Sequence, residues 1–139
     1  MALFPPDMPG VDPGFDDREF WAHCRNRELR FQTCADCGTP RHPPGPVCPS
    51  CRSLAVEWVE APVEAELYSF TVVHYASHPA VKPNLPYAVG LVTFAGLPGV
   101  KLVSNITGCE PADMRIGMKL QLWWDDIGEG QFLPRFRPI

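Results

Sequence analysis

Two pairs of cysteines carry the clearest chemistry in this sequence. Cys34 and Cys37 form one CxxC pair, and Cys48 and Cys51 form a second pair ten residues further on. Two intervening residues let both thiolates of a pair turn toward one ion, and four thiolates fill a tetrahedral shell. Because a filled shell leaves no open coordination position, we expect a structural ion and no Lewis-acid catalysis.

Zinc is the expected ion, and iron is the alternative because the same four thiolates accept it. A redox dithiol is disfavoured, since a thioredoxin-like CxxC motif needs a βαβ context that this sequence lacks. Gly38, directly after the first pair, permits the positive φ of a metal-binding turn. His23 and His42 could each replace a thiolate, but four cysteines suffice, and both are interpreted as ordinary polar residues.

No residue pattern indicates a catalytic site. Cys24 falls on an apolar helical face and is interpreted as a small core residue, while Cys109 follows a strand without an adjacent basic residue to lower its pKa. The motifs GxSxG, HExxH, GxxxxGK and GxGxxG do not occur. Asp125 and Asp126 precede a Gly-rich turn and are interpreted as turn residues. We therefore assign no catalytic residue.

The composition limits both the fold and the partners. The 17 prolines and 11 glycines disfavour long helices and favour turns and short strands. The formal charge of −4 opposes the phosphate backbone of a nucleic acid. We see neither a membrane-spanning apolar run nor a signal peptide, and so expect a cytoplasmic protein whose cysteines are metal ligands and buried thiols.

The elements before the first cysteine pair are short. Residues 1–15 are rich in Pro, Gly and Asp, which suits either an extended leader packed on another surface or a disordered tail. Asp16 and Glu19 resemble a capping box, so we predict a helix that ends at about Asn26.

The cysteine pairs themselves lie in a loop system between two strands. Alternating apolar residues predict a strand over residues 28–33, which leads directly to the first pair. Residues 34–51 contain five prolines and two glycines, so regular structure there must be brief. Val56 and Trp58 alternate with a polar residue and predict a return strand. Residues 16–61 are therefore expected to form a helix and a four-cysteine zinc ribbon.

Residues 62–139 are expected to form a small β-barrel. Five runs have strand character: residues 67–74, 87–95, 100–106, 120–125 and 132–136. Gly-containing segments at residues 96–99 and 128–130 suit tight hairpin connections. Five short antiparallel strands in a domain of this size are typical of the five-stranded OB-fold barrel. The expected fold is mainly β.

With these motifs in place, the chain resembles the DUF35 family, which combines an N-terminal rubredoxin-like zinc ribbon with an OB-fold domain. The resemblance covers nearly the whole chain and rests on both cysteine pairs with Pro49 and on residues 29–34 (LRFQTC), 68–74 (YSFTVVH), 86–89 (PYAV), 116–118 (IGM) and 133–136 (LPRF). Members are typically partner subunits of thiolase-like enzymes, including thiolases, aldolases that cleave steroid side chains, and acetoacetyl-CoA thiolase assemblies. The resemblance implies a hetero-oligomer whose catalytic residues belong to the partner.

The loop of residues 75–86 (YASHPAVKPNLP) suits an acyl-CoA at or near such an interface. Tyr75, His78 and Lys82 offer apolar and cationic groups for the acyl chain and the phosphates. A plain Pro-rich connector is the alternative interpretation.

Aromatic residues could anchor the interface with a partner. Phe4 and Phe15 lie in the leader, and Trp123 and Trp124 are adjacent on a strand. Adjacent strand residues point to opposite faces, so one tryptophan is expected to face outward.

Two classes of function follow. The first is a zinc-containing accessory subunit that supports the folding and acyl-CoA binding of a thiolase-fold enzyme, which cleaves carbon–carbon bonds. The second is a nucleic-acid-binding or general interaction module, because zinc ribbons and OB-folds bind nucleic acids in other proteins. The acidic charge disfavours the second.

Overall fold

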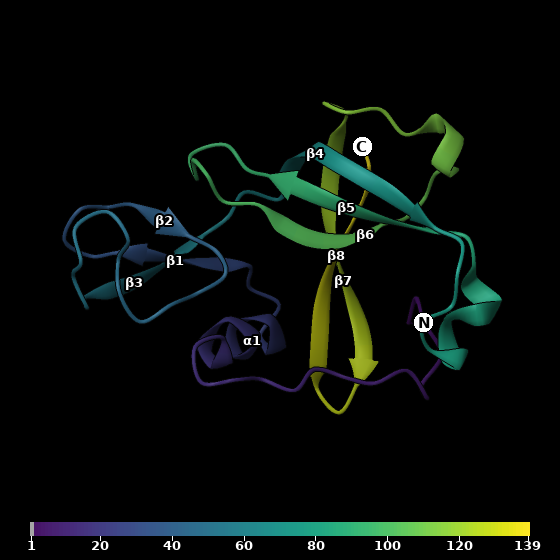
Figure 1. Ribbon diagram of the computed structural model, residues 1–139, viewed down its shortest axis with the longest axis horizontal. Coiled ribbons are helices and arrows are strands. Elements are labelled where there is room, and N and C mark those ends of the chain that lie inside the picture. Colours follow the sequence, from purple (N-terminus) through teal and green to yellow (C-terminus); the bar gives the residue numbers. More distant parts are fainter. Residues whose placement is uncertain (1) are drawn as a thin grey trace.

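A computed structural model describes residues 2–139 and places a small helix-and-sheet unit beside a β-barrel (Figure 1). The helix α1 (Arg18–Arg25) is confirmed, but its N-cap is Asp17, and no side chain caps its first turn. The carboxylate of Asp17 instead accepts from the indole nitrogen of Trp21 at 3.0 Å. The predicted capping box at Asp16 is therefore wrong. Asp17 takes the N-cap position, and its carboxylate bonds to the Trp21 side chain instead of to a backbone amide of the first turn.

A three-stranded antiparallel sheet follows the helix. Its central strand β1 (Arg30–Cys34) lies between β2 (Pro40–Arg41) and β3 (Val56–Glu60). β1 pairs with β3 over its whole length, from Arg30 opposite Glu60 to Cys34 opposite Val56. This pairing brings Cys34, the first cysteine of the two CxxC pairs, to the end of the sheet where the loop system begins.

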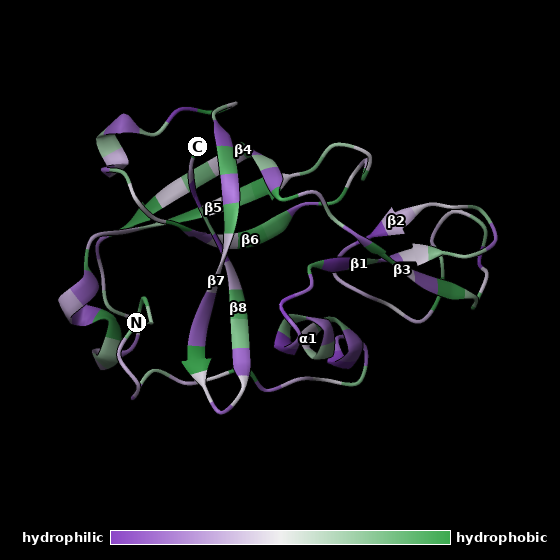
Figure 2. Ribbon diagram, turned by 180° about the vertical axis from the view of Figure 1, so that it is seen from behind, coloured by the Kyte–Doolittle hydropathy of each residue, from purple (hydrophilic) through white to green (hydrophobic). Residues whose placement is uncertain are grey.

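Five strands then close the barrel in the order β4-β5-β6-β8-β7. Their bounds are β4 (Glu64–Val73), β5 (Tyr87–Thr93), β6 (Leu102–Ile106), β7 (Lys119–Gly128) and β8 (Gln131–Pro138). All neighbours are antiparallel except β6 and β8, which run parallel with Ile106 opposite Phe136. The mainly β fold with a five-stranded OB-fold barrel is thus confirmed, and Figure 2 shows hydrophobic and hydrophilic residues interspersed along the barrel strands.

One hydrophobic core joins the helix, the sheet and the barrel. The rings of Phe20, Phe31, Phe94 and Phe136 form a continuous series, with successive centroids 6.0, 5.3 and 5.9 Å apart. Burial of aromatic rings is a large stabilising contribution, so the helix and ribbon are held against the barrel. The division at residue 62 into two domains remains a proposal.

The first residues of the leader lie along the barrel. The amide of Leu3 donates to both carboxylate oxygens of Asp125, at 3.2 and 3.3 Å, and its carbonyl accepts from Asn84 at 2.9 Å. The ring of Phe4 packs edge-on against Tyr87 with centroids 5.2 Å apart. Of the two predicted alternatives, the structure shows the extended leader packed on another surface, and Figure 1 shows it passing below the barrel toward α1.

Two 3-10 helices, η1 (Pro79–Asn84) and η2 (Pro111–Asp113), lie in the connections of the barrel. The first occupies half of the loop of residues 75–86. Within residues 2–139, no helix has the length and apolar character needed to cross a membrane.

Candidate metal centre

Four cysteine sulfurs gather at one end of the three-stranded sheet. The Sγ atoms of Cys34, Cys37, Cys48 and Cys51 all lie within 4.8 Å of one another. Cys34 and Cys51 are separated by 3.5 Å between sulfurs, and Cys37 and Cys48 by 3.6 Å. An ion bound tetrahedrally with Zn–S bonds of about 2.3 Å separates its thiolates by about 3.8 Å. The cluster therefore has the size of a four-thiolate zinc site.

The same backbone turn presents both pairs. In the first turn, Gly38 donates its amide to the carbonyl of Cys34 at 2.9 Å and has φ of +78°. In the second, Arg52 donates to the carbonyl of Cys48 at 2.9 Å and has φ of +64°. The prediction of a positive φ at Gly38 is confirmed. The second turn has Arg52 instead of glycine at this position, so its positive φ was not indicated by the sequence.

Backbone amides in these turns favour the thiolate form that a metal requires. The amide of Cys37 lies 3.4 Å from the sulfur of Cys34 and lowers the pKa of that thiol. The amide of Cys51 likewise lowers the pKa of Cys48 to about 6. A thiolate is the metal-binding species, so Cys34 and Cys48 are prepared for an ion. At Cys51 the amide of Ser53 acts in the same direction, but burial and contacts with the other three thiols raise its pKa to about 12, which a bound cation would offset. The four residues fit a closed structural zinc site, which stabilises the ribbon and supplies no open position for catalysis.

The two remaining cysteines are not activated. Cys24 is buried, and burial raises its pKa to about 12. Burial also raises the pKa of Cys109, with further contributions from the nearby acidic residues Asp113 and Glu110. A reactive cysteine needs a lowered pKa, so the interpretation of both residues as structural agrees with their surroundings.

The residues predicted to contact acyl-CoA lie together around η1. Tyr75 is 82% exposed, and Lys82 is also exposed. His78 accepts the backbone amide of Ala80 at Nδ1, at 3.0 Å, and so caps η1. None of the three lines either pocket described for residues 2–139. Their role in substrate binding remains a prediction.

The two adjacent tryptophans of β7 differ in what they contact. Both Trp123 and Trp124 are half-buried. The indole nitrogen of Trp123 donates to Thr107 at 2.9 Å, and Trp124 packs against the core. Trp123 therefore lies on the outer face, as strand alternation predicted, but its contact with Thr107, directly after β6, leaves it half-buried. In the leader, Phe15 is 84% exposed, as an interface anchor would be.

A buried polar network on the barrel was not predicted. Arg135 donates from Nε to Asp125 at 3.1 Å and from Nη1 to Asn105 at 2.6 Å, and Asn105 donates in turn to the carbonyl of Ala88. Burial lowers the pKa of the Arg135 guanidinium, while the hydrogen bond to Asp125 opposes that effect. Asp126 does accept the amide of Gly128, as expected of a turn residue. For Asp125 that interpretation is wrong, since its side chain is fully buried beneath the leader and accepts from Arg135 and from the amide of Leu3.

These features define a protein with a rubredoxin-like zinc ribbon joined to an OB-fold. Residues 21–57 match the family model described as the rubredoxin-like zinc ribbon domain of ChsH2, and residues 58–125 match that of the C-terminal OB-fold domain of ChsH2. The chain belongs to the DUF35 family, and its two domains are of the ChsH2 type.

Solved structures agree with this assignment. The structure described as "Ltp2-ChsH2(DUF35) aldolase" contains a chain that is 38% identical, with a TM-score of 0.82, and the match covers 94% of this chain and 98% of that one. A DUF35-family protein from Sulfolobus solfataricus matches with 20% identity and a TM-score of 0.63, over 91% and 87% of the two chains. The latter likeness shows the fold alone.

Three curated relatives are similar in sequence. A probable enoyl-CoA hydratase alpha subunit of Thermomonospora curvata is 42% identical over 88% of this chain, and a 3-oxo-4,17-pregnadiene-20-carboxyl-CoA hydratase alpha subunit of Mycobacterium tuberculosis is 31% identical over 90%. The chain spans only 37% and 39% of their respective lengths. A DUF35 domain-containing scaffold protein of Methanocaldococcus jannaschii is 28% identical over 78% of this chain and 77% of its own length.

Proposed function

We propose that this chain is a zinc-containing, non-catalytic subunit of a hetero-oligomeric enzyme. The partner would have a thiolase fold and would cleave a carbon–carbon bond of an acyl-CoA, by thiolysis or by a retro-aldol reaction. The observation that carries the proposal is the match to the aldolase structure, which extends over 94% of this chain and 98% of that one. A chain that matches an assembly's DUF35 component from end to end is well suited to the same position.

The chemistry of the chain supports a non-catalytic role. The four clustered cysteines suit a closed metal shell, and Cys24 and Cys109 both have raised pKa values. Such a chain contributes by folding against its partner and by supplying part of the substrate's surroundings. The six free cysteines also suit a reducing compartment such as the cytoplasm.

The loop around η1 is the proposed contact with acyl-CoA. Lys82 is exposed and cationic, and a lysine is a common partner of phosphate groups. Tyr75, which is exposed at the start of the same loop, offers an aromatic surface to the partner or the substrate.

The test is to express the partner enzyme with and without this chain and to assay cleavage of an acyl-CoA. We expect activity only when both chains are present, and none from this chain alone. Equal activity without this chain would contradict the proposal, and turnover by this chain alone would show that it holds a catalytic site.

A pair of charge-matched variants tests the contact with acyl-CoA in the same assay. Lys82→Ala should raise KM for acyl-CoA with kcat little changed, because a phosphate contact contributes to binding in the ground state. Lys101→Ala is the control, because Lys101 lies over the ring of Tyr68 and outside the η1 loop. Identical kinetics for the two variants would contradict the assignment of Lys82.

A further inference from the structure

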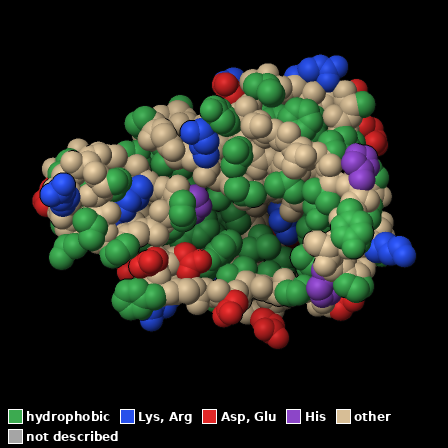
Figure 3. Space-filling view, in the orientation of Figure 1, with side chains coloured by type: hydrophobic (Ala, Val, Ile, Leu, Met, Phe, Trp, Pro, Cys, Tyr) green, Lys and Arg blue, Asp and Glu red, His purple; other side chains and the backbone are tan. Residues whose placement is uncertain are grey.

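A hollow lies between the leader and the outer face of the barrel. Its volume is about 560 Å³, within the range of small-molecule sites. Its apolar walls come from the leader residues Phe4, Pro5 and Met8 and from the barrel residues Val89, Val103 and Leu133. Figure 3 shows it as a depression lined by hydrophobic side chains, with a basic side chain within it.

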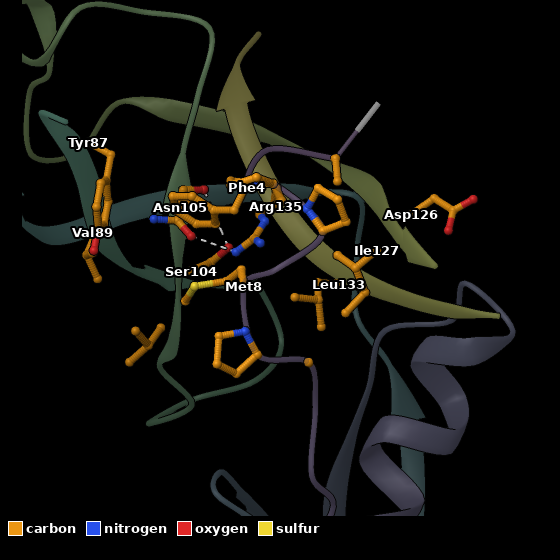
Figure 4. Close-up of a pocket in the computed structure, with 16 residues that line it drawn as sticks. Phe4, Met8, Tyr87, Val89, Ser104, Asn105, Asp126, Ile127, Leu133 and Arg135 are labelled. Carbon is orange, nitrogen blue, oxygen red and sulfur yellow. Dashed lines mark hydrogen bonds between the residues drawn. The ribbon is translucent and has the colours of Figure 1, made fainter. Parts of the chain in front are cut away.

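Arg135 is the basic residue that lines this hollow, and Figure 4 shows its side chain beside Phe4 and Asn105. The guanidinium lies 5.5 Å from the centroid of the Phe4 ring, which holds it in place from the leader side. A guanidinium has five N–H groups, and Asp125 and Asn105 accept from two of them. Donors therefore remain for an acceptor atom that enters the hollow.

The charges around the hollow favour a neutral ligand. Asp125 already balances the positive charge of Arg135. Asp126 lines the edge of the hollow, but Figure 4 shows its carboxylate pointing away from it, where it accepts the amide of Gly128. An anionic group would lose its hydration without finding an unbalanced positive charge in the hollow, while a carbonyl oxygen needs only one hydrogen-bond donor. A cationic group would lie against the guanidinium.

We propose that this hollow binds a neutral, mainly apolar ketone, with its hydrocarbon body between the leader and the barrel and its carbonyl oxygen on Arg135. Every residue that forms the site belongs to this chain, so the inference goes beyond the proposed role as a subunit and does not depend on it. The leader is one wall of the site, which gives the packing of Phe4 a function in binding.

The experiment uses the full zinc-loaded chain with isotope-labelled methyl groups and 2-undecanone as the probe. We expect saturable shifts in the NMR signals of Met8 and Ile127, which line the hollow, and none at Ile116, which is exposed and outside it. Decanoate carries a carboxylate at the same end of a similar chain, and it should bind at least about tenfold more weakly because desolvating a charge is costly.

Matched tryptophan variants locate the site. Val103→Trp places an indole in the hollow from an exposed position, and should weaken ketone binding at least about tenfold by occupying the volume. Val63→Trp is the control, since Val63 is similarly exposed and lies outside the hollow. Unchanged zinc content and thermal stability in both variants show that the fold is intact.

Four results would overturn the proposal. They are an absence of shifts at Met8 and Ile127, equal binding by the two tryptophan variants, tighter binding of decanoate than of the ketone, and a partner protein that occupies the hollow. The last is recognised if Val103→Trp, but not Val63→Trp, prevents assembly with the partner enzyme and the assembled complex excludes the ketone.

Discussion

The Nε atom of Arg135 lies 3.1 Å from Oδ2 of Asp125, and the Asp125 side chain is completely buried. The two residues are diagonal neighbours across β7 and β8, since Trp123 is opposite Arg135 and Asp125 is opposite Leu133. The same carboxylate accepts the amide of Leu3. One buried acidic group therefore connects the two strands to the leader.

Asp125→Asn should destabilise the protein by about 3–5 kcal/mol, because it leaves the buried guanidinium without a compensating charge. Lys119→Gln is the control, since Lys119 and Glu66 form an exposed pair at 3.0 Å, and its loss should cost less than about 1 kcal/mol. Urea denaturation measures both. The double change Asp125→Leu with Arg135→Met should cost less than Asp125→Asn, and a larger cost would contradict this account of the pair.

Freshly purified protein should contain about one zinc ion per chain, because four thiolates fill one shell and the ribbon has little core of its own. Cys37→Ser or Cys48→Ser should lose the metal and unfold at a lower temperature. Cys109→Ser, which lies outside the cluster, should retain both properties. Elemental analysis and thermal denaturation are the measurements, and metal retention by the Cys37 variant would show that the ligand assignment is wrong.

Gly90→Ala should destabilise the barrel by about 1–3 kcal/mol through overpacking. A Cβ atom at Gly90 would lie 2.8 and 2.9 Å from side-chain atoms of Ile106 and 3.0 Å from Leu67. Gly45→Ala meets no atom within 4 Å and should leave the free energy of unfolding nearly unchanged. Equal stabilities of the two variants would mean that the barrel interior has spare volume at Gly90.

The stability of the protein should depend on pH through His42, whose ring packs 4.9 Å from Phe20 and 5.2 Å from Phe31 between centroids. Burial lowers the pKa of His42 to about 4 in the folded protein, below its ordinary value of 6.5. Between pH 6.5 and pH 4 the unfolded chain therefore binds more protons than the folded protein. The stability that the neutral, buried His42 ring contributes is complete above pH 6.5 and is lost as the pH falls toward 4. The loss should amount to about 3 kcal/mol.

Denaturant unfolding of the native protein and of His42→Phe, measured from pH 7 to pH 4, isolates this contribution. The difference in unfolding free energy between the two proteins should change over that window, while acid release of zinc affects both. Parallel pH profiles would show that His42 is not the titrating group.

The protein should not bind single-stranded nucleic acid appreciably at physiological salt, since its formal charge is −4 and nucleic-acid binding depends on clustered basic groups. A fluorescence titration with a labelled oligonucleotide measures this. Submicromolar affinity would favour the alternative function of a nucleic-acid-binding module.

The metal centre and the barrel were predictable because their signals are local. The cysteine spacing places four sulfurs together without knowledge of the rest of the chain, and alternation locates each strand of the barrel. Such signals depend on the turn geometry of a CxxC pair and on the two-residue period of a strand.

The network around Asp125 was not predictable in the same way. The burial of Asp125 depends on the register of β7 against β8. Leu3, whose amide bonds to the same carboxylate, is distant in sequence. A charged pair before a Gly-rich turn has the same local pattern whether its side chains are exposed or buried. The half-burial of Trp123 has the same origin, since the covering residue Thr107 belongs to another strand connection.

The hydrogen bond between Leu3 and Asp125 joins residues 122 positions apart in the chain. A ribosome releases the leader 122 residues before the carboxylate that holds it, so the leader stays unattached while those residues are synthesised. The cysteine cluster closes within 18 residues and can take up its ion long before then. We therefore expect the ribbon of a nascent chain to fold before Phe4 packs against the barrel.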